Sequence, residues 1–186
     1  MNFVECQGYM IPGLYYANNY CIWLLNWDKS PTQNGHLIEI WLFSPDGKRT
    51  CYIDPLEDED FFNRYHSFDN LVGASIKIQH NKKNISIEAA ALNGDVIQGE
   101  IILGTSILYS LINLTLSEKN KIVGKTETGK TSQNIPKKLH KITSSKITIN
   151  GSDMGSLVSP KQEIKVGDFS ISKRPILSHC KLRLEE

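Results

Sequence analysis

The stretch that decides the fold is residues 71–103, LVGASIKIQHNKKNISIEAAALNGDVIQGEIIL. Apolar and polar residues alternate in it, beginning with Ile76 and Ile78 on one face, which is the pattern of a half-buried strand. A polar turn at 81–84 separates the first such run from the second. The dipeptide Asn93-Gly94, a strong signal for a type I′ turn, separates the second run from the third. We therefore predict a three-stranded antiparallel meander over 71–103.

The chain before the meander shows the same rhythm of strands and turns. Residues 20–27 are apolar enough for a buried strand, and residues 36–43 alternate between two faces. Pro45-Asp46-Gly47 then supplies a tight reversal, so that 49–53 returns as the partner strand. A short helix is expected near Glu57–Tyr65, because its first residues are acidic and suit a helix N-terminus.

The chain after the meander is harder to assign. Residues 105–117 fit both helical spacing and the alternation of a strand, and we favour a strand. Residues 118–141 are polar and rich in lysine, which predicts a long mobile loop. Strands are expected again at 146–149, at 163–171 and at about 176–184.

The composition agrees with a fold built from strands. Ile occurs 22 times and Ala only 5 times, and Ile, Val and Thr together make 37 of the 186 residues. Such β-branched residues favour strands over helices. We predict one all-β, mainly antiparallel domain over 1–186. It is a barrel or sandwich of roughly eight to ten strands, with at most one or two short helices.

The total charge is balanced, but its distribution is uneven. Lys and Arg number 21 and Asp and Glu number 20, which excludes a dedicated nucleic-acid binder. Residues 1–69 carry a net charge of −6 and residues 118–186 a net charge of +7, with eight lysines and one glutamate in 119–146. This basic stretch indicates either a patch for an anionic partner or a solvated flexible loop.

Several classes of site and location are disfavoured by what the sequence lacks. No apolar run approaches the ~18 residues of a membrane span, and the first residues lack the basic start and apolar core of a signal peptide. We therefore expect a cytoplasmic protein, with Cys6, Cys21, Cys51 and Cys180 as free thiols. No histidine pair and no cysteine pair has metal-ligand spacing, so neither a metal nor a cofactor is predicted.

Residues 124–131, GKTETGKT, match the phosphate-binding pattern GxxxxGK[ST] letter for letter. Such a loop needs a strand before it and a helix after it, so that backbone N–H groups wrap the phosphates. Only Ile122-Val123 precede the match, and Pro136 would interrupt a helix soon after it. We interpret 124–131 as an exposed polar loop that binds no nucleotide.

Aromatic and ionisable residues gather in the first third of the chain. Trp23, Trp41 and Tyr52 fall on strands expected to be neighbours, where their rings could form one wall for an apolar ligand. Glu39 shares a face with Trp41. A carboxyl buried among aromatic rings would have a raised pKa and could act as a general acid. His66, on the following connection, is the second candidate for proton transfer. These rings could equally just fill a core.

The segments IEIWLFSPDGKRTCYID and FDNLVGASIKIQHNKKNISIEAAALNGDVIQGEIIL resemble, in their strand rhythm, the lipocalin-like (calycin) barrels of the carotenoid hydratase and AttH type. The resemblance covers about residues 20–103, and it implies a hydrophobic small ligand inside a barrel. The first hypothesis is therefore binding of an apolar small molecule in an aromatic-lined cavity. The alternatives are an acid–base enzyme of hydratase, isomerase or cyclase type on the same barrel, and an interaction module without a cavity.

Overall fold

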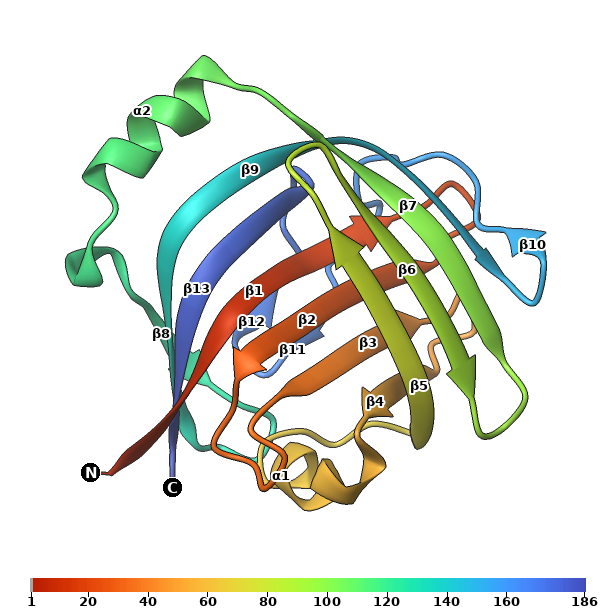
Figure 1. The fold of residues 1–186 in the computed structure, drawn as a ribbon, viewed down its shortest axis with the longest axis horizontal. Coiled ribbons are helices and arrows are strands. Elements are labelled where there is room, and N and C mark those ends of the chain that lie inside the picture. Colours follow the sequence, from red (N-terminus) through yellow and green to blue (C-terminus); the bar gives the residue numbers. More distant parts are fainter. Residues whose placement is uncertain (1) are drawn as a thin grey trace.

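In the computed structural model, which describes residues 2–186, the main sheet closes into a ring (Figure 1). Each ring strand is hydrogen-bonded to two neighbours, in the order β9-β13-β1-β2-β3-β4-β5-β6-β7 and back to β9. The predicted all-β class is confirmed. The ring strands are β1 (Phe3–Tyr15), β2 (Cys21–Lys29), β3 (Leu37–Phe43), β4 (Arg49–Asp54), β5 (Asn70–His80), β6 (Asn84–Ala91), β7 (Val96–Gly104), β9 (Thr131–Ile149) and β13 (Ile176–Glu185).

The long strand β9 closes the ring because it pairs with two different partners. Its first part, from Ser132, pairs with β13, and its second part, up to Ile149, pairs with β7. The change of partner falls at Lys141, which lies opposite both Ile176 and Gly104. The prediction of a loop over 118–141 is therefore wrong from Thr131 onward, and also at Ile122–Lys125, which form strand β8 and pair with β9. The strand is polar because only one of its faces packs inward, while its backbone bonds are satisfied along both edges.

Hairpin turns of one kind join three strand pairs. In each, three residues ending in glycine connect the strands, at Gly47, Gly94 and Gly129, with φ of 86°, 91° and 82°. The meander of β5, β6 and β7 is confirmed, but its second turn is not type I′. A type I′ turn needs positive φ at both central residues, and only Gly94 has it here, not Asn93. The turn is a type I turn followed by a glycine in the left-handed region, the common three-residue hairpin.

The phosphate-loop match is the third of these hairpins. The amide of Thr126 donates to the carbonyl of Lys130 at 2.9 Å, and strand β9 rather than a helix follows. The segment therefore lacks the strand–loop–helix arrangement of a phosphate-binding loop. The expectation that the whole segment is exposed is wrong, since Thr126 is 5% exposed.

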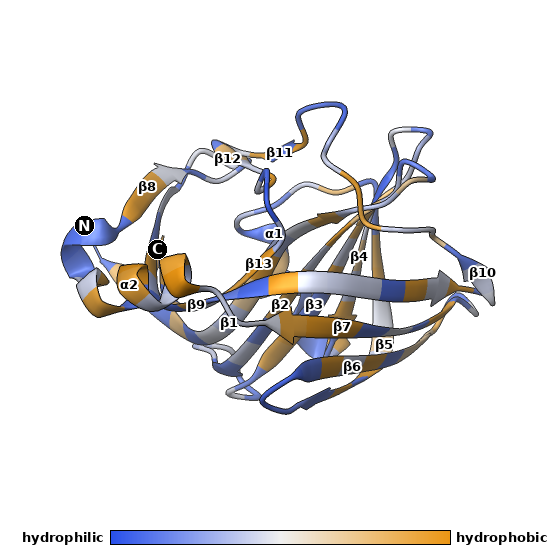
Figure 2. Ribbon diagram, turned by 90° about the horizontal axis from the view of Figure 1, so that it is seen from above, coloured by the Kyte–Doolittle hydropathy of each residue, from blue (hydrophilic) through white to orange (hydrophobic). Residues whose placement is uncertain are grey.

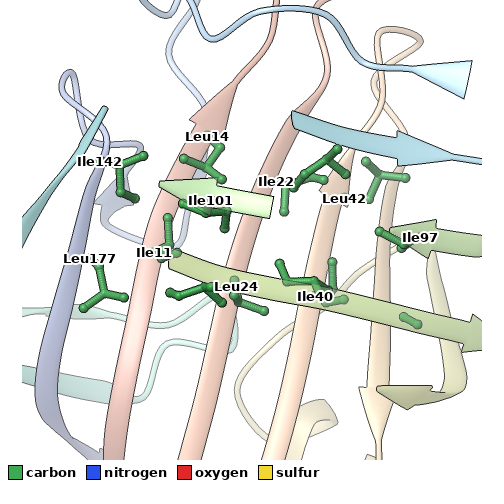
Figure 3. Close-up of a cluster of buried hydrophobic side chains, with 14 of the residues drawn as sticks. Ile11, Leu14, Ile22, Leu24, Ile40, Leu42, Ile97, Ile101, Ile142 and Leu177 are labelled. Carbon is green, nitrogen blue, oxygen red and sulfur yellow. The ribbon is translucent and has the colours of Figure 1, made fainter. Parts of the chain in front are cut away.

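The ring wall has two apolar faces, and each face forms a core. The interior is packed with aliphatic side chains from opposite walls of the ring (Figure 3). The outer face of β1–β4 and β13 carries the tryptophans and all four cysteines, which are free and buried. The labelled interior residues are Ile11, Leu14, Ile22, Leu24, Ile40, Leu42, Ile97, Ile101, Ile142 and Leu177.

A layer of short elements covers this outer face (Figure 2). The crossover between the parallel strands β4 and β5 supplies the expected short helix, and a hairpin about Gly167 replaces the continuous strand expected at 163–171. The Asp168 amide donates to the carbonyl of Lys125 at 2.9 Å, which ties this hairpin to β8. The covering elements are η1 (Leu56–Asp58), α1 (Glu59–Asn63), β8 (Ile122–Lys125), β11 (Lys165–Val166) and β12 (Phe169–Ser170). Two further short elements are η2 (Glu118–Asn120) and β10 (Ser152–Asp153), and β10 pairs with the end of β9.

Residues 105–117 form a helix and not the strand we favoured. Helix α2 spans Ile107–Thr115, and the Ser106 side chain accepts a hydrogen bond from the Tyr109 amide as an N-cap. The side chain of Asn113 donates to the carbonyl of Leu139 at 3.0 Å and accepts from its amide at 2.7 Å. The cap and this tie to β9 favour the helix where hydrophobic spacing alone was ambiguous.

The interior packing predicts a contrast between two identical substitutions. Leu24 is fully buried in the ring, whereas Leu92 is 78% exposed at the β6–β7 turn. Leu24→Ala should lower the free energy of unfolding by about 2–5 kcal/mol because it leaves a cavity. Leu92→Ala should change it by less than about 0.5 kcal/mol. Urea unfolding measures both, and equal losses would contradict the assignment of the interior.

Candidate functional site

The outer face of β2 and β3 forms a wall of stacked indole rings. Trp23 lies opposite Trp41 in the strand register, and their rings stack with centroids 5.4 Å apart and planes at 17°. Trp27 lies on the same face of β2, two residues beyond Leu25. Two of the three predicted aromatic residues therefore meet as expected. The wall presents an apolar surface.

Glu39 lies in this wall and is 4% exposed. It is two residues before Trp41 on β3, so both side chains leave the strand on one face, and the Trp41 Nε1–H donates to Glu39 Oε2 at 2.9 Å. Burial raises the pKa of the Glu39 carboxyl to about 8, against the opposing effect of the Trp41 bond. The carboxylic acid form of Glu39 therefore predominates at neutral pH.

A cavity of about 330 Å³ lies between this wall and the covering layer. Its floor comes from β2 and β3, its roof from β8 and the β11–β12 hairpin, and one side from α1 and the residues that follow. The remaining side comes from β1, β9 and β13. The lining includes Cys6, Met10, Trp23, Leu25, Trp27, Glu39, Trp41, Phe61, Phe62, Tyr65, His66, Ile122, Asn134, Val166, Phe169, Leu182 and Leu184.

His66 also lines the cavity and is held by charged neighbours. Its ring centroid is 4.7 Å from that of Trp41 in an edge-on contact, and its Nδ1 lies 3.7 Å from Glu127 Oε2. Glu127 in turn pairs with Arg49 and accepts from the Ser67 amide at 3.0 Å. Burial lowers the pKa of His66 more than Glu127 raises it, so the imidazole is neutral at pH 7.

Several polar atoms of the lining have no hydrogen-bond partner within the protein. They are Trp23 Nε1, Tyr65 Oη, His66 Nδ1 and Asn134 Oδ1. Buried polar atoms are normally paired with protein, water or a ligand. The side chains of Trp23 and Tyr65 are 2% and 1% exposed. The cavity is thus mainly apolar, with a small number of polar groups on its surface.

Tyr52 does not belong to this site, although the sequence suggested it. In the register of β3 and β4, Cys51 lies opposite Trp41, and Tyr52 lies opposite Ile40. Tyr52 therefore points into the ring, where its hydroxyl donates to Asp95 Oδ2 at 2.7 Å. The difference is one residue of register, which moves a side chain to the other face of the sheet.

Little in the sequence indicated the residues that cover the cavity. Tyr65 follows the short helix that we expected, but nothing in its neighbourhood identified a cavity. Val166 and Phe169 lie more than a hundred residues after the wall that they cover. The one local signal was Gly167, which marks the turn that folds these two residues into a hairpin.

The fold also brings three histidines together at one end of the ring. His80, His140 and His179 come from β5, β9 and β13, with ring centroids 5.8 Å apart for the first and third and 5.6 Å for the last two. Burial lowers the pKa of each imidazole. Within residues 2–186, no group of three His, Cys, Asp or Glu side chains is arranged to hold a metal ion.

No family model and no curated protein matches the sequence. Among solved structures, the chain is similar in fold to a crystal structure of acetoacetate decarboxylase from Legionella pneumophila. The TM-score is 0.52 and the identity 8%, over 99% of this chain and 85% of that chain. This likeness supports a barrel-like β fold, but it does not test the resemblance to the lipocalin-like barrels of the carotenoid hydratase and AttH type.

The buried carboxyl predicts a specific dependence of stability on pH. The pKa of Glu39 is about 8 when folded, against 4.5 for an ordinary glutamate, so the folded chain binds more protons between these values. Stability from this group is therefore present at low pH and is lost as the pH rises through that window. Relative to wild type, Glu39→Gln should be equally stable at about pH 4.5 and roughly 2–5 kcal/mol more stable at about pH 9.

Denaturant unfolding at both pH values provides the measurement. Gln keeps an oxygen that can accept from Trp41 Nε1 but cannot ionise, which isolates the effect of charge. Glu88→Gln, on the exposed face of β6, is the matched control and should show no such difference. A constant difference between wild type and Glu39→Gln at all pH values would contradict the raised pKa.

Proposed function

We propose that the chain binds an apolar small molecule in the aromatic cavity outside its barrel. The observation that carries the proposal is a cavity of about 330 Å³ lined by Trp23, Trp27 and Trp41 and holding one buried carboxyl, Glu39. Ligand sites are typically concave, mainly apolar and equipped with a few polar groups, in a range of about 300–1,000 Å³. The cavity is at the small end of that range, which favours a compact ligand.

The chemistry of the lining narrows the class of ligand. The indoles of Trp23 and Trp41 give an aromatic, apolar surface that suits an apolar molecule. The protonated Glu39 and the unpartnered hydroxyl of Tyr65 are both hydrogen-bond donors. A neutral ligand with one or two acceptor oxygens fits this arrangement better than a carboxylate or a phosphate, because no lysine or arginine lines the cavity.

The site differs from the one that the lipocalin-like resemblance implied. That resemblance suggested a ligand inside the barrel, whereas the interior of this ring is packed with aliphatic residues such as Leu24 and Ile101. We therefore propose a hydrophobic ligand on the outer face of the wall and not inside the ring.

The likeness to a decarboxylase does not extend our proposal to that reaction. Lysines that form Schiff bases with carbonyl substrates are activated by desolvation in apolar pockets or by a neighbouring cation. No lysine lines this cavity. The neighbour therefore bears on the fold of this chain and not on its chemistry.

A second candidate function is acid–base catalysis in the same cavity. The observation that favours it is the pKa of Glu39, raised to about 8, since a general acid works best when its pKa lies near the operating pH. Neutral His66 lines the same cavity and could accept a proton. A ketone could then enolise, with His66 removing the proton next to the carbonyl and Glu39 protonating the carbonyl oxygen.

Binding is tested with 1-aminoanthracene, a neutral flat probe that accepts energy from tryptophan. We expect saturable energy transfer at one site per chain. Trp41→Leu should weaken binding at least about fivefold, because it removes one of the two stacked rings. Tyr52→Phe is the control: its hydroxyl lies inside the ring, so binding should be unchanged. Absence of saturable binding would contradict the proposal.

Catalysis is tested with 4-phenyl-2-butanone in deuterium oxide. Enolisation breaks a C–H bond next to the carbonyl, and return of the enol forms a C–D bond, which proton NMR detects as loss of signal. If Glu39 acts as the acid, Glu39→Gln should slow the exchange by about 100-fold while probe binding persists. Exchange no faster than in buffer would leave binding as the sole function of the cavity.

A further inference from the structure

The exposed large apolar side chains are concentrated in one short part of the chain. Among the described residues, eight such side chains are exposed, and six of them lie between residues 107 and 123. The other two, Leu92 and Val96, flank the β6–β7 turn at the far end of the molecule from α2 (Figure 1). Four of the six, Ile107, Leu108, Leu111 and Leu114, lie on α2 and are here called the apolar patch; the other two, Ile122 and Val123, lie on β8.

Contacts on the inner side of α2 hold the patch outward. The two hydrogen bonds between the Asn113 side chain and the Leu139 backbone fix the helix against β9. Tyr109 and Ile112, on the same side, are half-buried. With 100° per residue, Ile107, Leu111 and Leu114 fall on the opposite side of the helix. They are 83%, 59% and 83% exposed. The hydrogen bonds to Leu139 therefore turn the apolar side of α2 away from the barrel.

Five lysines lie near the apolar patch along the chain, or on the part of β9 to which α2 is tied. Lys119 and Lys121 follow α2 directly, and Lys137, Lys138 and Lys141 flank Leu139, to which α2 is tied. Within residues 2–186, none of these five lysines forms a salt bridge, whereas the one nearby acid, Glu118, is paired with Arg183. The part of the chain around α2 thus carries positive charge that no acidic side chain among the described residues compensates. The basic stretch 119–146 noted in the sequence contributes all five lysines.

We propose that the apolar patch docks onto an anionic bilayer surface. The α2 side chains would enter the boundary between headgroups and acyl chains, and the five lysines would contact anionic headgroups. A second copy of the chain fits less well, because a symmetric contact would bring two sets of these lysines together. The helix lies on the membrane and does not cross it: within residues 2–186 no helix is long and apolar enough to span one.

The test is co-sedimentation with lipid vesicles. Wild type should pellet with phosphatidylcholine vesicles that contain about one third phosphatidylserine, and pellet far less with phosphatidylcholine alone. Leu111→Gln combined with Leu114→Gln should weaken binding at least about tenfold, since both leucines would sit in the apolar phase. Leu92→Gln removes an equally exposed apolar side chain elsewhere and should bind like wild type.

The charge contribution is tested by neutralising two lysines. Lys137→Gln with Lys138→Gln should weaken binding and reduce its salt dependence, whereas Lys48→Gln with Lys77→Gln, an equal change of charge on β5 and the β3–β4 turn, should have little effect. Thermal unfolding of each variant confirms that it is folded.

Three outcomes would overturn the proposal: no sedimentation with either vesicle, equal loss on the Leu92 and Leu111 changes, or a dimer in gel filtration that Leu111→Gln dissociates. The last would assign the patch to a second copy. Binding of 1-aminoanthracene is measured on the same variants and should be unchanged, because Leu111 and Leu114 do not line the cavity. Failure of membrane docking is thereby separated from failure of the cavity proposal.

Discussion

The backbone pairing of β9 is the interaction on which the rest of the structure depends. Without it, β7 and β13 would end the sheet as two open edges with unpaired N–H and C=O groups. The same strand also carries the outer elements, because β8 pairs with its first residues and Asn113 of α2 binds the backbone at Leu139. Ring closure, the roof of the cavity and the orientation of α2 thus share one support. A strand of 19 residues is long enough to do all three.

The two faces of the wall have different roles. Aliphatic side chains fill the ring, and their close packing stabilises the folded chain. The outer face of β2 and β3 carries tryptophans, and the short elements above it cover these rings without filling all the space between. The candidate site is therefore an incompletely filled second core. Glu39 can remain there because the cavity's apolar surroundings keep it protonated, so that no unpaired charge is buried.

Local signals in the sequence were enough to predict much of the ring. The turn at Pro45-Asp46-Gly47 set the pairing of 36–43 with 49–53, and alternation placed Trp41 and Glu39 on one face. The same reasoning failed for Tyr52, because the register set by this turn pairs Trp41 with Cys51 and leaves Tyr52 on the other face of the sheet. It also failed for β9, whose lysines resemble a loop when its partners are not known.

The cavity itself could not be predicted, for a physical reason. Its wall is encoded in residues 21–43, but its roof comes from Ile122, Val166 and Phe169, and only tertiary contacts bring them over that wall. The helix α2 needed a long-range contact as well, since its own periodicity fitted a strand equally. What a single segment encodes was predictable from sequence, and what two distant segments form together was not.

The single parallel pair, β4 with β5, has a consequence of parity. Neighbours in the ring form eight antiparallel pairs and one parallel pair. Strand direction reverses at every antiparallel step, so a closed circuit needs an even number of reversals. Nine strands cannot alternate all the way round, and one pair must run the same way. Parallel neighbours need a connection that travels back along the barrel. In this chain, that connection is the segment with α1 and His66, and the same segment forms one side of the cavity.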